Sequence, residues 1–359
     1  MSSQVIIQGL KIGGGAPVRV ESMLKTPLTD IEGCVSQCDR LLRAGCEMAR
    51  VALPDARLAL NLKELIYKTN LLLMADIHFD PDIAISAMVN GCSAIRINPG
   101  NMPTFKLAEM IKVAKDMDVT IRIGANGGSL GNSHMQKANN DRALALFYAV
   151  EEQAEILIKN DFSKNIILSA KSSNIPETIR ANSLISKKYN YPIHIGITEA
   201  GFETEGLVKG AVGIGIMLSE GIGDTIRVSL TDEPEQEVRA GYAILNALEI
   251  RNRGVNIISC PTCGRRRIEV KELLKIIAPL IKEIPEGAMK SFAVMGCEVN
   301  GPREAKHADF GIAGTPNGVA VFVKGEIIGS YSVEEAPRII RELLLEQQQR
   351  TDAKAMSFS

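Results

Sequence analysis

Three cysteines in the last third of the 359-residue chain have a spacing that suits a metal centre. Cys260 and Cys263 form a Cys-x-x-Cys pair after one short apolar run, and Cys297 follows another. Such a pair is ambiguous, because it occurs in zinc sites, redox disulfides and iron–sulfur clusters. The fourth ligand is open as well: His307 would complete a structural zinc site, whereas Glu304 or an open position would suit a [4Fe–4S] cluster with one labile iron.

The other four cysteines, Cys34, Cys38, Cys46 and Cys92, fall in helical or closely packed stretches. Their positions are typical of small buried core residues rather than of ligands. Seven cysteines, an odd number without a dense framework, indicate free thiols in a reducing cytoplasm.

Polar and charged side chains recur at the ends of successive apolar runs in the first two thirds of the chain. They are Arg50, Asp76, His78, Arg96, Asn98, Arg122, Asn126, Lys171, Glu199, Arg227 and Ser229. Strand side chains alternate between faces, so Arg96 shares a face with Asn98, and Arg227 shares one with Ser229. In a closed barrel these groups would converge on the C-terminal mouth, where barrel enzymes have their sites. The four arginines and the lysine would then form a positive cup suited to a phosphate or diphosphate.

Eight strand–helix units are predicted to position these residues. The predicted strands are 18–22, 47–53, 71–76, 94–98, 120–125, 165–169, 193–198 and 225–229. Amphipathic stretches between them have the periodicity of helices. Eight units favour an α/β fold of the (β/α)8 TIM-barrel type, although an open doubly wound sheet would alternate in the same way. Residues 5–15 are predicted to form a hairpin that covers the bottom of the barrel.

The pattern changes after residue 254. We therefore expect a substrate-binding TIM barrel over residues 1–254 and a separate, small α/β domain over residues 255–359. The second domain would contain the three candidate metal-binding cysteines.

The composition argues against two classes of partner. Lys plus Arg total 41 and Asp plus Glu total 42, so the net charge of −1 gives no support for a nucleic-acid partner. Trp is absent and aromatic residues make up 4%, which disfavours base stacking. No apolar run approaches the roughly 18 residues of a membrane span, so we expect no membrane association.

Six longer motifs resemble those of one enzyme family. They are 75–78, 95–101, 194–201, 221–230, 260–263 and 295–302. Taken in this order they resemble the 4-hydroxy-3-methylbut-2-enyl diphosphate synthase family, and the likeness runs from Ile12 to Glu346. The chain departs from the family's usual pattern at Glu21, where Gln is common, and at Arg303, where Gly is common.

The resemblance implies a TIM barrel joined to a reductase-like domain with a [4Fe–4S] cluster. It implies that Cys260, Cys263, Cys297 and Glu304 bind the cluster. The implied reaction reduces and opens 2-C-methyl-D-erythritol 2,4-cyclodiphosphate to (E)-4-hydroxy-3-methylbut-2-enyl diphosphate, late in non-mevalonate isoprenoid biosynthesis. The implied partners are flavodoxin or ferredoxin, as electron donor, and a second copy of the chain in a head-to-tail homodimer.

Roles in that reaction can be assigned as hypotheses. The cup would bind the cyclic diphosphate, with hydrogen bonds from Asp76, His78, Asn98, Asn126 and Ser229. Glu304, a weak ligand for iron, would also act in catalysis by giving up its position. Glu199 is the candidate general acid that protonates the departing hydroxyl.

Two alternatives remain open at this point. One is a zinc-containing barrel lyase or hydrolase that acts on a phosphorylated metabolite, with His307 as the fourth zinc ligand. The other is a non-enzymatic redox sensor that uses an iron–sulfur cluster as its signal.

Overall fold

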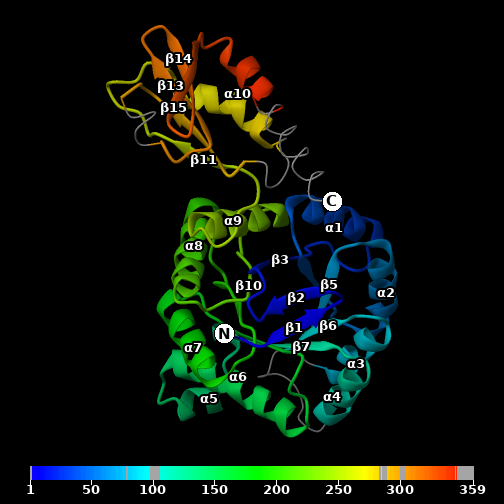
Figure 1. The fold of residues 1–359 in the computed structure, drawn as a ribbon. Coiled ribbons are helices and arrows are strands. Elements are labelled where there is room, and N and C mark those ends of the chain that lie inside the picture. The colour runs from blue at the N-terminus through cyan, green and yellow to red at the C-terminus, as the bar shows by residue number, and fades with distance from the viewer. Residues whose placement is uncertain are drawn as a thin grey trace. The chain divides into compact units, whose positions relative to one another are not determined.

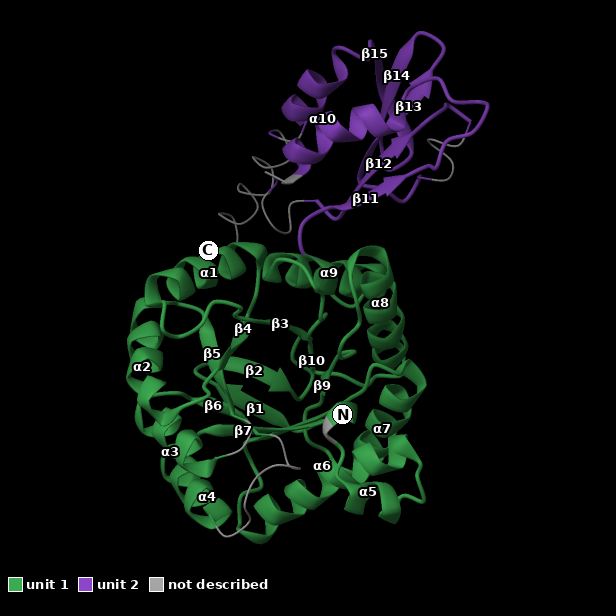
Figure 2. Ribbon diagram, turned by 180° about the vertical axis from the view of Figure 1, so that it is seen from behind, with its two compact units in different colours: residues 1–251 green, residues 252–359 purple. Residues whose placement is uncertain are grey.

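The chain forms two compact units in a computed structural model, residues 1–251 and residues 252–359 (Figure 2). The structure describes residues 2–77, 80–97, 106–282, 284, 289–299, 305–343 and 345. Within these residues, no helix is both long and apolar enough to span a membrane.

Eight parallel strands form the centre of unit 1. They are β3 (Arg19–Met23), β4 (Met48–Ala52), β5 (Leu72–Ile77), β6 (Ala94–Ile97), β7 (Thr120–Asn126), β8 (Ile166–Lys171), β9 (His194–Ile195) and β10 (Thr225–Ile226). The order in the sheet is β8-β7-β6-β5-β4-β3-β10-β9, and a parallel bridge between Leu168 and Ile193 brings its two ends together. The predicted TIM barrel is therefore confirmed.

Helices surround these strands (Figure 1). They are α1 (Ile31–Ala44), α2 (Ala59–Lys68), α3 (Pro81–Val89), α4 (Leu107–Asp116), α5 (Asn132–Lys137), α6 (Arg142–Lys159), α7 (Ile175–Lys188), α8 (Glu203–Ser219) and α9 (Pro234–Ala247). Local sequence explains their ends: Asp30 caps α1 by accepting a hydrogen bond from the Gly33 amide, and Gly45 ends it at φ 97°. The short α5, in the loop after β7, was not predicted.

An N-terminal hairpin closes one end of the barrel. Strands β1 (Gln4–Ile7) and β2 (Leu10–Gly13) pair antiparallel, as predicted. Val5, Ile7 and Ile12 are buried in an apolar cluster with residues from four barrel strands. These barrel residues are Met48, Met74, Ala94 and Ile167. Because the hairpin covers the N-terminal end, the charged residues of the barrel are left to the opposite end.

Unit 2 has a five-stranded mixed sheet. Its strands are β11 (Asn256–Ser259), β12 (Ser291–Met295), β13 (Phe310–Thr315), β14 (Gly318–Val323) and β15 (Glu326–Tyr331), in that order across the sheet. Strands β11, β12 and β13 are parallel to one another, and β14 pairs antiparallel with both β13 and β15. Helix α10 (Val270–Lys282) and helical residues 336–343 contribute to an apolar core with the sheet. The edge strand β15 was not predicted, because most of its side chains are exposed and it lacks a clear apolar alternation.

The hairpin offers a test of how the barrel is stabilised. Replacing Ile12, which is 0% exposed, by Ala should lower the free energy of unfolding of unit 1 by about 2–5 kcal/mol, through lost burial and a new cavity. Ile6, in the same hairpin, is 51% exposed, and Ile6→Ala should change stability by no more than about 0.5 kcal/mol. Urea unfolding of both variants checks this, and equal effects would contradict the role given to the hairpin.

Candidate functional site

The strand register places three charged residues side by side inside the barrel. Asp76 pairs with Arg96 across β5 and β6, and Arg96 pairs with Arg122 across β6 and β7. All three are at most 3% exposed. Charged groups as buried as these require partners, and their partners define the site.

Asp76 holds two of the predicted arginines. Its Oδ1 accepts a hydrogen bond of 2.9 Å from Arg96 Nη1, and its Oδ2 lies 3.7 Å from Arg50 Nη2. Arg96 Nη2 also donates to the Gly124 carbonyl at 3.4 Å. A Cβ atom at Gly124 would lie 2.8 Å from Arg96 Nε, so glycine there makes room for the guanidinium.

Glu21 of β3 connects Arg122 to the far side of the barrel. Arg122 Nη1 donates to Glu21 Oε2 at 2.6 Å, and His194 Nδ1 lies 3.6 Å from the same oxygen. His194 Nε2 in turn contacts Lys171 Nζ at 2.8 Å. The strands β3, β7, β8 and β9 thus meet in one buried polar network.

Arg227, directly after β10, is fixed by a carboxylate from a helix. Its Nε and Nη2 donate to the two oxygens of Glu237 on α9, both at 3.1 Å. Ser22 Oγ also donates to Glu237 at 3.0 Å, and the Leu230 amide donates at 3.2 Å. This fork-like pairing orients the guanidinium more strictly than a single contact would.

The cup, defined here as Arg50, Arg96, Arg122, Lys171 and Arg227, is strongly cationic. Burial and the neighbouring guanidinium groups lower the pKa of Arg50 to about 9, although Asp76 opposes the shift. Burial, followed by the charges of nearby arginines, also lowers the pKa of Lys171 well below its usual value. Four arginines and Lys171 share this space with the three carboxylates of Asp76, Glu21 and Glu237, so the arginines alone outnumber the carboxylates and the cup favours an anion.

Unsatisfied polar atoms support the same conclusion. Arg50 Nε and Arg122 Nη2 are buried, and neither has a hydrogen-bond partner among the described residues. Buried donors without partners are uncommon in proteins. An anion with several oxygen atoms would satisfy them, so the cup can chemically bind a phosphate or diphosphate.

The remaining predicted site residues are half-buried, are exposed, or lie outside the described residues. Asn126 pairs in register with Lys171 and is half-buried, as is Ser229. Glu199 is exposed, at φ 50°, in the loop after β9 and is not part of the buried network. His78, Asn98 and Glu304 lie outside the described residues.

The buried network contains Glu21, His194 and Glu237, which sequence reasoning did not assign to the site. Glu21 lies within the predicted strand 18–22, and this position could have identified it, since a carboxylate in a buried strand needs a partner. His194 starts its strand and Glu237 is in the first turn of a surface helix, so their positions carry little signal by themselves.

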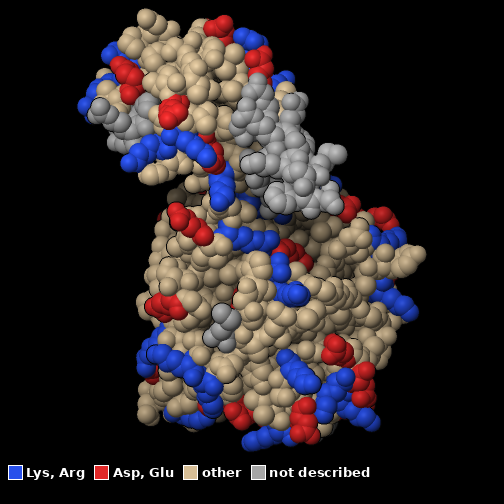
Figure 3. Space-filling view, viewed as in Figure 1, with Lys and Arg blue, Asp and Glu red and all other residues tan. Residues whose placement is uncertain are grey.

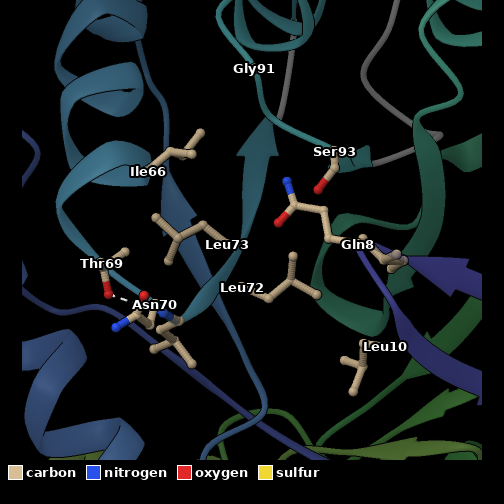
Figure 4. Close-up of a pocket in the computed structure, with 11 residues that line it drawn as sticks. Gln8, Leu10, Ile66, Thr69, Asn70, Leu72, Leu73, Gly91 and Ser93 are labelled. Carbon is tan, nitrogen blue, oxygen red and sulfur yellow. Dashed lines mark hydrogen bonds between the residues drawn. The ribbon is translucent and has the colours of Figure 1, made fainter.

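A hollow at the other end of the barrel does not share this chemistry. It has a volume of about 290 Å³ beside the hairpin and is lined by Gln8, Asn70 and Ser93 among apolar side chains (Figure 4). None of its described lining residues is charged. On the face seen in Figure 3 the acidic and basic residues of unit 1 are interspersed, so that surface shows no comparable concentration of one sign.

In unit 2 the candidate metal-binding loops leave adjacent strands. Ser259 of β11 pairs with Val294 of β12, so the loops that carry Cys260 and Cys297 begin side by side. Cys260 Sγ accepts a hydrogen bond from the Gly296 amide at 3.0 Å. A Cβ at position 296 would lie 3.3 Å from this sulfur, so glycine permits the close approach.

The donor set suits a metal–sulfur centre. Cys263 is exposed, and hydrogen bonds from the backbone and side chain of Arg265 lower the pKa of its thiol, which favours the thiolate that binds metals. Cys297 is buried beside Gly296. Cys260, Cys263 and Cys297 are all described, yet among the described residues no three Cys, His, Asp or Glu side chains lie close enough together to hold a metal ion.

The four cysteines of unit 1 are buried, as predicted. Burial raises the pKa of the Cys34 and Cys92 thiols and raises that of Cys38 to about 11. The pKa of Cys46 is also raised, chiefly by burial. These thiols are suited to core packing rather than to ligation.

Both units match models of one protein family. Residues 2–242 match the GcpE TIM-barrel domain, and residues 256–346 match the GcpE protein C-terminal domain. The chain belongs to the GcpE family. Its similarity to this family, expected from the six motifs, is thereby confirmed.

Curated relatives in the GcpE family are similar over nearly their whole length. A protein of Thermodesulfovibrio yellowstonii is 46% identical, covering 90% of this chain and 93% of its own. A protein of Caldanaerobacter subterraneus subsp. tengcongensis is 43% identical, covering 96% of each chain. Both are named 4-hydroxy-3-methylbut-2-en-1-yl diphosphate synthase (flavodoxin).

Among solved structures, the dihydropteroate synthase of Yersinia pestis resembles part of the chain. The TM-score is 0.48 at 13% identity, covering 69% of this chain and 100% of that one. A likeness at this level carries no functional conclusion.

The fit between Gly124 and Arg96 gives a test of the cup. Gly124→Ala should displace the Arg96 guanidinium and weaken the binding of inorganic diphosphate by about tenfold or more, since a misplaced charge-assisted contact is lost. Gly128→Ala is the matched control, because nothing lies within 4 Å of the added Cβ. Isothermal titration calorimetry measures both, and unchanged affinity in Gly124→Ala would contradict the cup's geometry.

Proposed function

We propose that this protein reduces 2-C-methyl-D-erythritol 2,4-cyclodiphosphate to (E)-4-hydroxy-3-methylbut-2-enyl diphosphate in non-mevalonate isoprenoid biosynthesis. The observation that carries the proposal is the buried cationic cup, in a chain whose two units both match the GcpE family. The synthase name of the relatives agrees with an iron–sulfur oxidoreductase. Neither the zinc enzyme nor the redox sensor has comparable support.

The charge of the substrate fits the cup. Each phosphorus of a cyclic diphosphate has one ester bond, one anhydride bond and one strongly acidic hydroxyl, so the molecule is a dianion at neutral pH. Arg50 Nε and Arg122 Nη2 are available donors for its oxygens. We assign further hydrogen bonds to Asn126 and Ser229, and retain Asp76, His78 and Asn98 in the proposed substrate site.

The cysteine loops would hold the cofactor. We propose that Cys260, Cys263, Cys297 and Glu304 bind a [4Fe–4S] cluster, which when bound supplies electrons one at a time. Ala305, which follows Glu304 in the sequence, is buried in an apolar cluster against which Cys260 packs. The proposed electron donor is flavodoxin, which is part of the relatives' name, or ferredoxin. The proposed assembly is a homodimer in the cytoplasm, where thiols stay reduced.

The residues of the barrel contribute charge stabilisation and a proton. As the ring opens, the C–O bond to phosphate breaks and negative charge grows on the diphosphate, which the preformed cup stabilises without reorganisation. The departing hydroxyl needs one proton to leave as water, and two electrons come from the external donor. We assign that proton to Glu199, whose place at the mouth-side end of β9 keeps it outside the buried ion pairs.

Anaerobic turnover tests the proposed function directly. The full chain with its cluster, incubated with the cyclic diphosphate and a chemical reductant, should form the linear diphosphate, detected by phosphorus NMR. Glu199→Gln should lower turnover by about a hundredfold or more and leave the visible absorption unchanged. Glu205→Gln, at another exposed acid nearby in sequence, should have little effect. Full turnover by Glu199→Gln would show that its assigned role is wrong.

Loss of one thiol should remove the chromophore. Cys263→Ser is expected to abolish or greatly weaken the broad visible absorption of anaerobically purified protein, because serine is a poor ligand for iron. Cys92→Ala, at a buried cysteine of unit 1, should retain the absorption and the iron content.

A Glu304→Ala variant distinguishes an iron–sulfur cluster from a zinc site. It should weaken the retention of iron, whereas a zinc site completed by His307 would be unaffected.

A further inference from the structure

Lys171 and His194 form a buried pair of bases inside the cup. Lys171 Nζ lies 2.8 Å from His194 Nε2, and His194 Nδ1 lies 2.6 Å from Thr225 Oγ1. His194 and Thr225 are at most 1% exposed, and Lys171 is 7% exposed. The pair therefore lies in a closed environment that bulk water reaches poorly.

This contact can be made in two protonation states without moving a heavy atom. In the neutral state, His194 Nε2–H donates to the Lys171 amine, and the Thr225 hydroxyl donates to Nδ1. In the charged state, the Lys171 ammonium donates to Nε2, and Nδ1–H donates to Thr225 Oγ1. A hydroxyl both donates and accepts, so Thr225 satisfies the imidazole in either tautomer.

The charges around the pair decide between the two states. Arg50 on β4, Arg122 on β7 and Arg227 after β10 oppose a further positive charge on the pair. Glu21 on β3 is the acidic group that favours it, with Oε2 lying 3.6 Å from His194 Nδ1. Of the charges that act most strongly on Lys171, three are cations and one is a carboxylate, which itself pairs with Arg122. Without a bound anion, the surroundings therefore disfavour a positive charge on the pair.

The same balance lies behind two pKa shifts. Burial, followed by Arg50, Arg122 and Arg227, lowers the pKa of Lys171. Burial, followed by Arg122, Lys171 and other cations, lowers the pKa of His194 as well. A bound dianion would offset these cations and raise the pKa of Lys171 towards its ordinary value.

We infer that the cup takes up a proton when it binds the cyclic diphosphate, and that the Lys171–His194 pair holds this proton. The inference rests on the proposed function for the identity of the dianion. Binding and protonation then strengthen each other, because each brings a charge that stabilises the other. The proton converts Lys171 from a neutral amine into a fifth cation only when an anion is present.

The sign of the pH dependence follows from linkage. Lys171 has a higher pKa in the complex than in the free protein. Its contribution to the affinity for the anion is therefore complete at pH values below the pKa that Lys171 has in the free protein. This contribution is lost as the pH rises through the pKa that Lys171 has in the complex. Between the two values, affinity should fall by up to about tenfold for each pH unit, which corresponds to uptake of about one proton.

Calorimetry of the cluster-loaded full chain tests the inference. The cyclic diphosphate is titrated without reductant, so that no turnover occurs, in two buffers with different ionisation enthalpies at each pH from 6 to 9. The charge of this ligand is constant over the range, so a buffer-dependent heat reports protons taken up by the protein. We expect uptake approaching about one proton in part of this range. Binding with identical heats in both buffers throughout would overturn the inference and leave the proposed function standing, whereas absence of binding would overturn both.

Three variants locate the proton. Lys171→Met should bind more weakly and show no uptake, whereas Lys188→Met, at an exposed lysine of α7, should behave as the unmodified protein. Glu21→Gln should shift the uptake interval to lower pH, because it removes the carboxylate that favours the charged pair. Persistent uptake in Lys171→Met, or an unshifted interval in Glu21→Gln, would place the proton elsewhere and overturn the assignment.

Discussion

Five basic side chains, four of them arginines, enclosed within one barrel are the constraint on which the rest of this site depends. An isolated buried charge is strongly unfavourable, and a cluster of like charges is more so. The barrel offsets this with three carboxylates that come from separate elements, Glu21 from β3, Asp76 from β5 and Glu237 from α9. Each carboxylate fixes at least one arginine, so the donors are oriented before any ligand arrives. Such preorganisation is the main way in which proteins stabilise charge that develops during a reaction.

Residues two positions apart on one face of a strand serve opposite ends of the barrel, the first at the apolar closed end and the second in the charged cup. Along β4, Met48 packs in the cluster beneath the hairpin, and Arg50 follows two residues later on the same face. Strand β5 repeats this arrangement with Met74 and Asp76. Each of these strands thus delivers an apolar residue to the closed end and a charged residue to the cup. A shift of register by one residue would reverse both faces, so the apolar contacts at the closed end also hold the charged groups in place.

The sequence predicted most of this arrangement because strand ends are informative in a parallel barrel. Arg96 and Arg122 lie in separate, neighbouring strands of the barrel, and closure of the barrel brings the charged residues of such strands together whatever the details of packing. The pairing partners could not be predicted in the same way. The contact between Glu21 and Arg122 joins residues 101 positions apart, and that between Arg227 and Glu237 depends on how α9 packs.

Other differences have local causes. Glu199 lies in the loop after β9, whereas most of the arginines of the cup lie within strands, and the chain turns at φ 50° at Glu199 and leaves this side chain exposed. The candidate cluster ligands were recognisable from cysteine spacing, but the hydrogen bond from the Gly296 amide to Cys260 required the register of β11 and β12. Spacing identifies which atoms can bind a metal, whereas the sheet decides which of them begin as neighbours.

The carboxylates in the cup also bear on how product would leave. In the proposed reaction a cyclic dianion becomes a linear diphosphate, whose terminal phosphate has a second ionisable oxygen and therefore carries more negative charge. A cup with five unopposed cations would bind this product more tightly than the substrate and would retain it. Glu21, Asp76 and Glu237 reduce the net positive charge while they keep each guanidinium oriented. The same ion pairs that make the empty cup stable thus limit its affinity for the more highly charged product, and a site of this kind can combine charge stabilisation with turnover.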